Sequence, residues 1–144
     1  MPQQGYSIGR DRSVVIILPD GTNLRLGKVT DFESKPSTTN QTVKGLDGVI
    51  DHLRFHEGWT FTLKTERRSP DLDNYWASIE ANYYAGISEP PVTLVETTLE
   101  PDGSVSQFRY EKVVLSFDEA GSWAADKSVS QSLSGMAAKR IKQA

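Results

Sequence analysis

The chain of 144 residues contains no cysteine, and this absence excludes several kinds of chemistry. Without thiols there is no disulfide, no thiolate nucleophile and no cysteine-bound metal. Long hydrophobic runs are also missing, since the longest, Val14–Leu18, is far shorter than the ~20 residues that a membrane-spanning helix needs. Met1–Tyr6 lacks the basic and apolar segments of a signal peptide, so we expect no secretion signal and no membrane anchor.

The chain also lacks an excess of cationic residues. It has 16 lysines and arginines against 19 aspartates and glutamates, a net charge of −3. A protein that grips nucleic acid needs clustered cations to neutralise phosphates, so this balance argues against such a protein. The same balance suits a surface that nucleic acid passes without binding.

No catalytic constellation stands out. The two histidines, His52 and His56, have the spacing of a helical zinc site, but the surrounding residues predict a strand. Arg54 would then lie between them on one strand face and oppose a metal ion. There is no Gly-x-Ser-x-Gly elbow, and the glycines around Leu46 lack the Lys-Ser/Thr of a phosphate loop. We therefore expect no catalytic, cofactor or metal site, and no enzyme activity.

What is present is mainly β pattern. Two hairpins, Ser13–Leu18 with Asn23–Val29 and Val92–Leu99 with Ser104–Phe117, are each joined by a Pro-Asp-Gly turn. Further strands are predicted over Val49–Thr65, with a break near Glu57-Gly58, and over Asp126–Ser134, where alternate serines share one face. The basic end, Lys139–Lys142, is expected to be solvated, with contact to an acidic partner as the alternative. The whole chain, residues 1–144, is expected to form one domain.

One helix is predicted over Ser69–Gly86. Ser69 can cap it, Pro70 suits its first turn, and the two Pro residues after Gly86 prevent its continuation. Five apolar residues recur at helical spacing and are expected to face the core. They are Leu72, Tyr75, Trp76, Ile79 and Tyr83.

A long polar loop is predicted at about residues 33–48. Loops of this length are uncommon in compact domains and are often functional. Its residues have little to bury within one domain, so we expect them to contact a neighbouring subunit. The candidates are Ser37, Thr38, Thr39, Asn40, Gln41, Thr42, Val43 and Leu46. Trp123, beside a turn, is expected either to cover the core or to anchor an interface.

The order of these elements resembles that of bacteriophage tail tube proteins of contractile tails. The resemblance is carried by Gly27–Lys35 leading into the loop, by Trp59–Lys64, and by the final stretch Asp126–Arg140. It covers nearly the whole chain and consists of layout, with no invariant motif.

The resemblance implies two packed antiparallel sheets with a flanking helix, which form a ring-shaped β-barrel when subunits assemble. It implies a structural subunit of a virion tail, made in the host cytoplasm, that self-assembles into stacked hexameric rings. The tube would enclose the tape measure protein, conduct DNA without specific binding, and contact sheath and baseplate proteins.

Two alternatives stay open. The chain resembles, nearly as well, the tube subunit of type VI secretion or contractile injection machines. An unrelated alternative is an independent β-barrel that carries a small apolar ligand among Trp59, Phe61, Tyr75 and Trp76.

Overall fold

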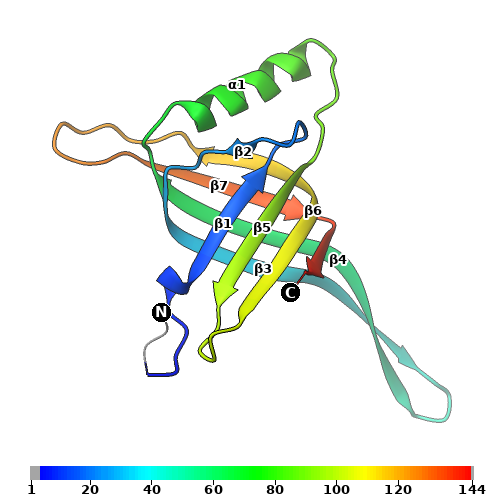
Figure 1. The fold of residues 1–144 in the computed structure, drawn as a ribbon. Coiled ribbons are helices and arrows are strands. Elements are labelled where there is room, and N and C mark those ends of the chain that lie inside the picture. The colour runs from blue at the N-terminus through cyan, green and yellow to red at the C-terminus, as the bar shows by residue number, and fades with distance from the viewer. Residues whose placement is uncertain (1–3, 144) are drawn as a thin grey trace.

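The computed structural model describes residues 4–143 and is mainly β with one α-helix, as the sequence predicts (Figure 1). A 3₁₀ turn, Gly9–Asp11, precedes the first strand. The elements that follow are β1 (Arg12–Ile17), β2 (Asn23–Leu24), β3 (Lys28–Lys44), β4 (Ile50–Glu66), α1 (Asp71–Tyr84), β5 (Val92–Leu99), β6 (Val105–Glu119), β7 (Ser130–Ala137) and β8 (Lys139–Lys142).

The strands form one antiparallel, eight-stranded sheet in the order β2-β1-β5-β6-β7-β4-β3, with β8 paired to β6. The sheet is not closed, and Figure 1 shows it folding over so that β1 and β5 cross β7, β4 and β3. The two separate sheets expected from the resemblance are not confirmed, because β6 belongs to both halves. Its first part pairs with β5 and β8, and its last part, Val114–Glu119, pairs with β7.

Strand β6 changes partners at an irregular point. Lys112 has a φ of 53°, in the left-handed region that side chains other than glycine rarely occupy, and the β5–β6 register shifts beside it. A bulge of this kind bends a strand and increases its twist. The bend at Lys112 thus lets one strand serve both halves of the sheet.

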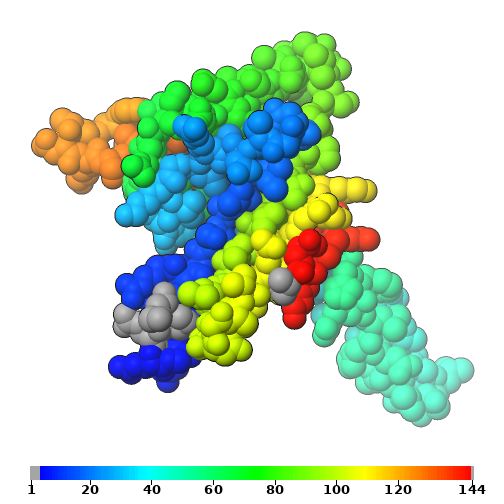
Figure 2. All heavy atoms as spheres, viewed as in Figure 1, coloured from blue at the N-terminus to red at the C-terminus, as the bar shows by residue number. Residues whose placement is uncertain are grey.

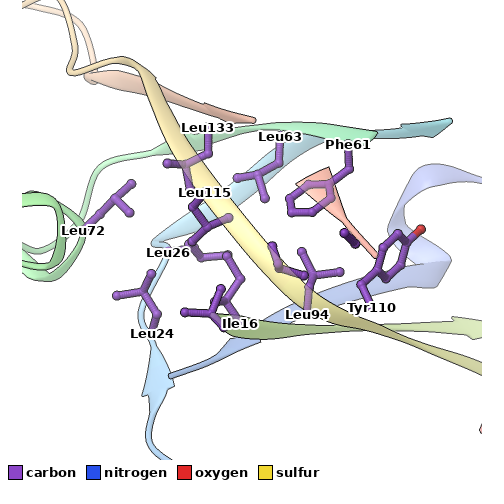
Figure 3. Packing of buried hydrophobic residues seen from close by; sticks show 13 residues of the cluster. Ile16, Leu24, Leu26, Phe61, Leu63, Leu72, Leu94, Tyr110, Leu115 and Leu133 are labelled. Atoms are coloured by element: carbon purple, nitrogen blue, oxygen red, sulfur yellow. The ribbon is translucent and has the colours of Figure 1, made fainter. Parts of the chain in front are cut away.

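The core lies between the two halves of the sheet and is closed at one end by α1 (Figure 3). Alternate residues of each strand point inward, as period-two patterning predicts. The fully buried members include Ile16, Leu94, Tyr110, Val113, Phe61, Leu63 and Leu133. Gly135 of β7 lies under the ring of Phe61, and a Cβ there would lie 2.4 Å from Phe61 Cζ. The core therefore requires glycine at this strand position.

Helix α1 begins after Pro70, which occupies the N-cap position with no side-chain capping bond. The predicted cap at Ser69 is wrong, since its hydroxyl bonds to the Asp71 carboxylate instead. Of the five residues predicted to face the core, Leu72 is buried and Tyr75, Trp76 and Ile79 are half-buried. The prediction is wrong for Tyr83, whose side chain is 75% exposed, because the helix extends past the edge of the sheet.

The predicted loop at 33–48 is wrong as a loop. Strands β3 and β4, each of 17 residues, form one long hairpin through this region. The break expected near Glu57-Gly58 is a register shift within β4, where Gly58 has a φ of 102°. Beyond that shift every residue from 38 to 57 is exposed, and we call this two-stranded ribbon the arm. Figure 2 shows the arm extending away from the rest of the molecule.

Candidate assembly surfaces

The arm is a regular ribbon with a defined turn. Its strands pair in register from Thr38↔His56 to Lys44↔Ile50. In the turn, the Gly45 and Gly48 amides donate to the Val49 and Gly45 carbonyls at 2.9 and 3.0 Å. The Val49 amide donates to Asp47 Oδ1 at 3.0 Å, and Gly48 has a φ of 85°. The Asp and Gly residues therefore specify a hairpin end here.

The register gives the arm two different faces. One, the apolar face, carries the exposed side chains of Val43, Leu53 and Phe55, with Thr39, Gln41 and Asp51 beside them. The other, the basic face, carries four basic side chains, and no acidic residue of the described arm lies on it. Its members are Lys44, His52, Arg54 and His56, with Ile50, Thr38, Asn40 and Thr42 beside them. An exposed ribbon with faces of such different chemistry is typical of a contact surface.

Most of the contact residues predicted from the sequence come together on the arm. Thr38–Val43 lie in its first strand, Leu46 is fully exposed at its tip, and Ser37 is half-buried at its base. Trp123 does not join them, since the segment around it lies on the other side of the molecule (Figure 1). Its side chain is 70% exposed, with Arg67 5.2 Å above the ring, so Trp123 does not cover the core.

A second exposed apolar surface lies at the C-terminal end of α1. There a groove of about 650 Å³ is lined by Trp76, Ile79, Tyr83, Tyr84 and Ile87, with Glu80 and Glu89 beside them. We call it the helix-end groove. The rings of Tyr83 and Tyr84 meet edge to face, with centroids 5.4 Å apart. Tyr84 and Ile87 were not predicted from the sequence as surface residues of interest. The aromatic pair Tyr83-Tyr84, just before Gly86 at the end of the helix, could have indicated an exposed apolar surface there.

Two carboxylates, those of Glu80 and Glu89, line this groove, and no lysine or arginine does. Burial, aided by the nearby Glu89 carboxylate, raises the pKa of Tyr75 from 10.0 to about 12. No basic residue occupies the last turn of α1, where the helix dipole is negative. The environment of the groove therefore favours a partner that brings apolar and cationic groups together.

The outward face of β3, β4 and β7 is polar. Asp31, Glu33 and Lys35 lie opposite Lys64, Thr62 and Thr60, and Ser132 and Ser134 continue these rows. The predicted alternation of serines with buried Val129, Gln131 and Leu133 is confirmed. Ser134 donates to Asp118 Oδ1 at 3.1 Å. Only one end of this polar face exposes large apolar side chains, those of Val114 and Met136.

The basic end of the chain is not simply solvated, so that expectation is wrong for Arg140. Strand β8 pairs with β6, and Arg140 Nη2 donates to Glu96 Oε1 at 2.5 Å. The Glu96 side chain is fully buried, the Tyr110 hydroxyl donates to its other oxygen at 3.1 Å, and Arg12 Nη1 lies 3.7 Å from that same oxygen. The Arg140 guanidinium also lies 3.7 Å from the centroid of the Phe108 ring. This network ties the C-terminal strand to the core.

The four aromatic residues of the ligand-carrier hypothesis do not line a common cavity. Phe61 is buried against Tyr110, and Trp59 contacts the same tyrosine from another direction. Tyr75 lines a shallow groove beside β2, whereas Trp76 lines the helix-end groove. These four side chains therefore do not form the shared site that this hypothesis needs.

Residues 4–143 contain no group of three or more His, Asp or Glu side chains arranged to hold a metal ion. His52 Nδ1 lies 3.4 Å from the Thr42 hydroxyl. Within the same part of the chain, no helix has the length and apolar character needed to cross a membrane.

An open sheet folded over one core, a single flanking helix and a projecting hairpin define the class of fold. No protein-family model matches the chain, and no curated protein matches its sequence. Solved structures nevertheless share the fold over nearly its whole length. A chain of the sheath/tube terminator of the extracellular contractile injection system PVC superposes with a TM-score of 0.68 at 13% identity, covering 99% of this chain and 100% of that chain.

Two further structures agree. A chain of the PVC sheath–tube complex in its extended state gives a TM-score of 0.67 at 12% identity, covering 91% of this chain and 88% of that one. A chain from the tail of an empty gene transfer agent particle gives 0.58 at 15% identity, covering 96% and 100%. The resemblance to tail proteins is therefore confirmed at the level of the fold, which this chain shares with proteins of contractile injection systems and phage-like tails.

Proposed function

We propose that this chain is a structural subunit of a phage-like tail tube, without enzymatic activity. Six copies form a ring, and rings stack into a tube that holds the tape measure protein and later conducts DNA. The subunit is made in the host cytoplasm and ends in the particle tail, with sheath and baseplate proteins as neighbours. Support comes from structures of assembled sheath–tube and tail particles that share the fold.

The observation that carries the proposal is the arm. None of its residues belongs to the core, although ordering each residue of a chain costs roughly 1–2 kcal/mol. Isolated two-stranded ribbons are marginally stable in water, and exposed apolar patches mark contact sites. The arm is therefore stabilised best when it contacts a neighbouring subunit, and its length suits a contact between rings.

Ring closure also accounts for the open sheet. Strands β2 and β3 end the sheet order, and each has a neighbour on one side only. Unpaired strand edges favour pairing with another chain, and a closed ring of subunits pairs all of them. The outward face of β1 and β8 exposes Val15 and Ile141, which suits it for burial between subunits.

The polar face of β3, β4 and β7 is the best candidate for the wall of the tube. Its hydroxyl groups and its excess of carboxylates, with Asp31, Glu33 and Asp118 against Lys35 and Lys64, provide no dense row of cations. Phosphates sliding past such a wall displace few counterions and are not held. A conduit for DNA needs this property.

A second candidate is a tube subunit or tube terminator of a contractile injection system. It is favoured by the match to the PVC terminator, which covers the whole of that chain. The two functions differ in how assembly stops. A tube subunit adds rings without limit, whereas a terminator, by its name, ends a tube and would form a single ring layer.

Light scattering and negative-stain microscopy of the purified chain test the proposal. We expect rings of about 96 kDa, from six copies of a 16.0 kDa chain, and tubes at higher concentration. A chain that remains monomeric at every concentration and salt would overturn the proposal. Rings that never stack would favour the terminator.

A variant with residues 38–57 replaced by an Asn-Gly turn tests the role of the arm. The two-residue turn suits an antiparallel pair, so the body should fold with nearly unchanged stability. We expect rings without tubes in micrographs. If thermal melts show that this variant is unfolded, the arm contributes to the stability of the domain itself. Normal tubes would show that the arm has no inter-ring role.

A further inference from the structure

We propose that the arm of one copy binds the helix-end groove of a copy in the next ring. This inference rests on the proposed tube function and names the docking site that the arm uses. Figure 1 shows that the arm and α1 lie at opposite ends of the subunit, so an arm does not reach its own groove. A contact between two different surfaces on successive copies is head-to-tail, and when it does not close it builds a filament.

The groove supplies an apolar floor between two acids. Tyr83, Tyr84 and Ile87 are each more than half exposed, an unusual concentration of large apolar surface for one helix end. Glu80 and Glu89 line the same groove, and no lysine or arginine does. The negative end of the helix dipole adds to this field. The groove therefore selects an apolar side chain flanked by cations.

The basic face of the arm has this pattern. Ile50 is exposed and lies directly opposite Lys44 across the ribbon. On the same strand and face, His52 and Arg54 follow Ile50 at alternate positions. An apolar residue between cations on the arm thus matches an apolar floor between carboxylates in the groove. Such electrostatic complementarity speeds association and fixes register between partners.

The other acidic surface of the subunit fits less well. The polar face carries Asp31 and Glu33, but the large side chains beneath it, Leu63 and Leu133, are buried. Its exposed apolar side chains, Val114 and Met136, lie in the same row across the strands as the cation Lys35, not between carboxylates. Among the described surfaces, the helix-end groove combines an exposed apolar floor with flanking carboxylates.

Charge reversal tests the docking. The arm variant is Lys44→Glu with Arg54→Glu, and the groove variant is Glu80→Lys with Glu89→Lys. All four positions are exposed, so folding should be unchanged by circular dichroism. We expect each variant to form rings but to lower the rate of tube growth at least about ten-fold, because like charges across an interface slow association and weaken binding. One chain carrying all four reversals should grow tubes at nearly the original rate.

The matched control reverses Asp126 and Lys127, an exposed pair in the segment after β6 that lies away from both surfaces. Its tubes should grow like those of the original chain. If the arm or groove variant grows like this control, the proposal is overturned, and the groove belongs to another partner. Failure of the four-reversal chain to grow faster than either parent variant would equally overturn it.

The absence of cysteine gives a second readout, because any introduced thiol is unique. Chains carrying Ile50→Cys and Ile87→Cys should form a ladder of disulfide-linked oligomers on mild oxidation of tubes. Chains carrying Ile50→Cys and Val105→Cys, the latter at the exposed β5–β6 end, are the control. Tubes without a ladder above the control overturn the docking and leave the tube function standing. If the original chain forms no tubes, both proposals fail.

Discussion

Removing the Arg140 guanidinium should strongly destabilise the subunit. Arg140→Ala leaves the fully buried Glu96 carboxylate with the Tyr110 hydroxyl and with Arg12, whose nearest nitrogen is 3.7 Å away. Deleting one partner of a buried ion pair typically costs 3–5 kcal/mol, because an uncompensated charge stays behind. We expect about 3 kcal/mol here, at the lower end of that range, because Arg12 and Tyr110 still face the carboxylate.

A loss of this size is a large part of the roughly 5–15 kcal/mol that stabilises a typical domain, so it should be easy to measure by urea unfolding. Arg12→Ala is the matched control. Its side chain is partly exposed and more distant, so its removal should cost less than about 1 kcal/mol. The double variant Glu96→Gln/Arg140→Met removes both charges at similar volume and should lie within about 1.5 kcal/mol of the original chain.

Two results would refute this reasoning. The first is a loss below about 1 kcal/mol for Arg140→Ala, which would mean that Glu96 finds water or another cation. The second is a Glu96→Gln/Arg140→Met variant whose loss of stability equals the sum of the losses measured for Glu96→Gln and Arg140→Met alone. That additivity would show that the two side chains act independently.

Other predictions concern packing, ionisation and DNA. Gly135→Ala should cost about 1–3 kcal/mol in urea unfolding, because its methyl group collides with the Phe61 ring, whereas Gly9→Ala, which adds a methyl group in open space, should be nearly neutral. The raised pKa of Tyr75 means that its contribution to stability is present below pH 10.0, the unfolded value, and is lost as pH rises towards about 12. Melting temperatures of Tyr75→Phe should therefore fall less steeply over this alkaline range than those of the original chain, and equal slopes would contradict the assignment. Trp76→Ala should cost about 1–2 kcal/mol, less than the 3–5 of a fully buried tryptophan, since its ring is half-buried; a loss under 0.5 would place the ring outside the packed face of the helix. Assembled tubes should retain little DNA in a filter-binding assay at about 0.15 M salt, and salt-sensitive micromolar binding would contradict an acidic tube wall.

Local chemistry predicted much of the fold. The second hairpin is confirmed almost residue for residue, because Pro, Asp and Gly at a turn and alternating apolar residues beside it act within a few positions of each other. The helix is confirmed within two residues at each end, since Pro70 and Gly86 limit it. These turn, strand and helix-end patterns depend only on residues that are close together in the sequence.

The arm could not be predicted in the same way. Strand patterning arises because one face of a strand is buried, but both faces of the arm are exposed, so Ser37–Thr42 show no alternation. Strands of 17 residues are also much longer than the usual 5–6, and Pro36 argued against a strand. The exposure of the predicted contact residues could be inferred from their polarity alone. Which of them share a face of the arm could be known only from the pairing register of β3 and β4.

The Glu96 network was hidden for a different reason. Arg140 meets a carboxylate 44 positions earlier in the chain, a distance over which sequence spacing carries no geometric information. A cluster of basic residues near a chain end usually lies in solvent, and only the pairing of β8 with β6 brings this arginine inside. Tyr83 was mispredicted, and the helix-end groove was not predicted, for a related reason. Helical spacing shows which residues share a face of α1, but it does not show where the supporting sheet ends.

The separation of arm and core has a consequence for how the chain can evolve. No core residue lies between Val29 and Trp59 except Phe32, so substitutions in the arm scarcely affect whether the subunit folds. Under the proposed tube function, selection can act on the arm through the neighbouring copy that it contacts, while the rest of the chain keeps its shape. The proposed contact could therefore change through substitutions in one ribbon alone, whereas substitutions in β4 beyond Trp59 would also alter the core and the stability of the fold.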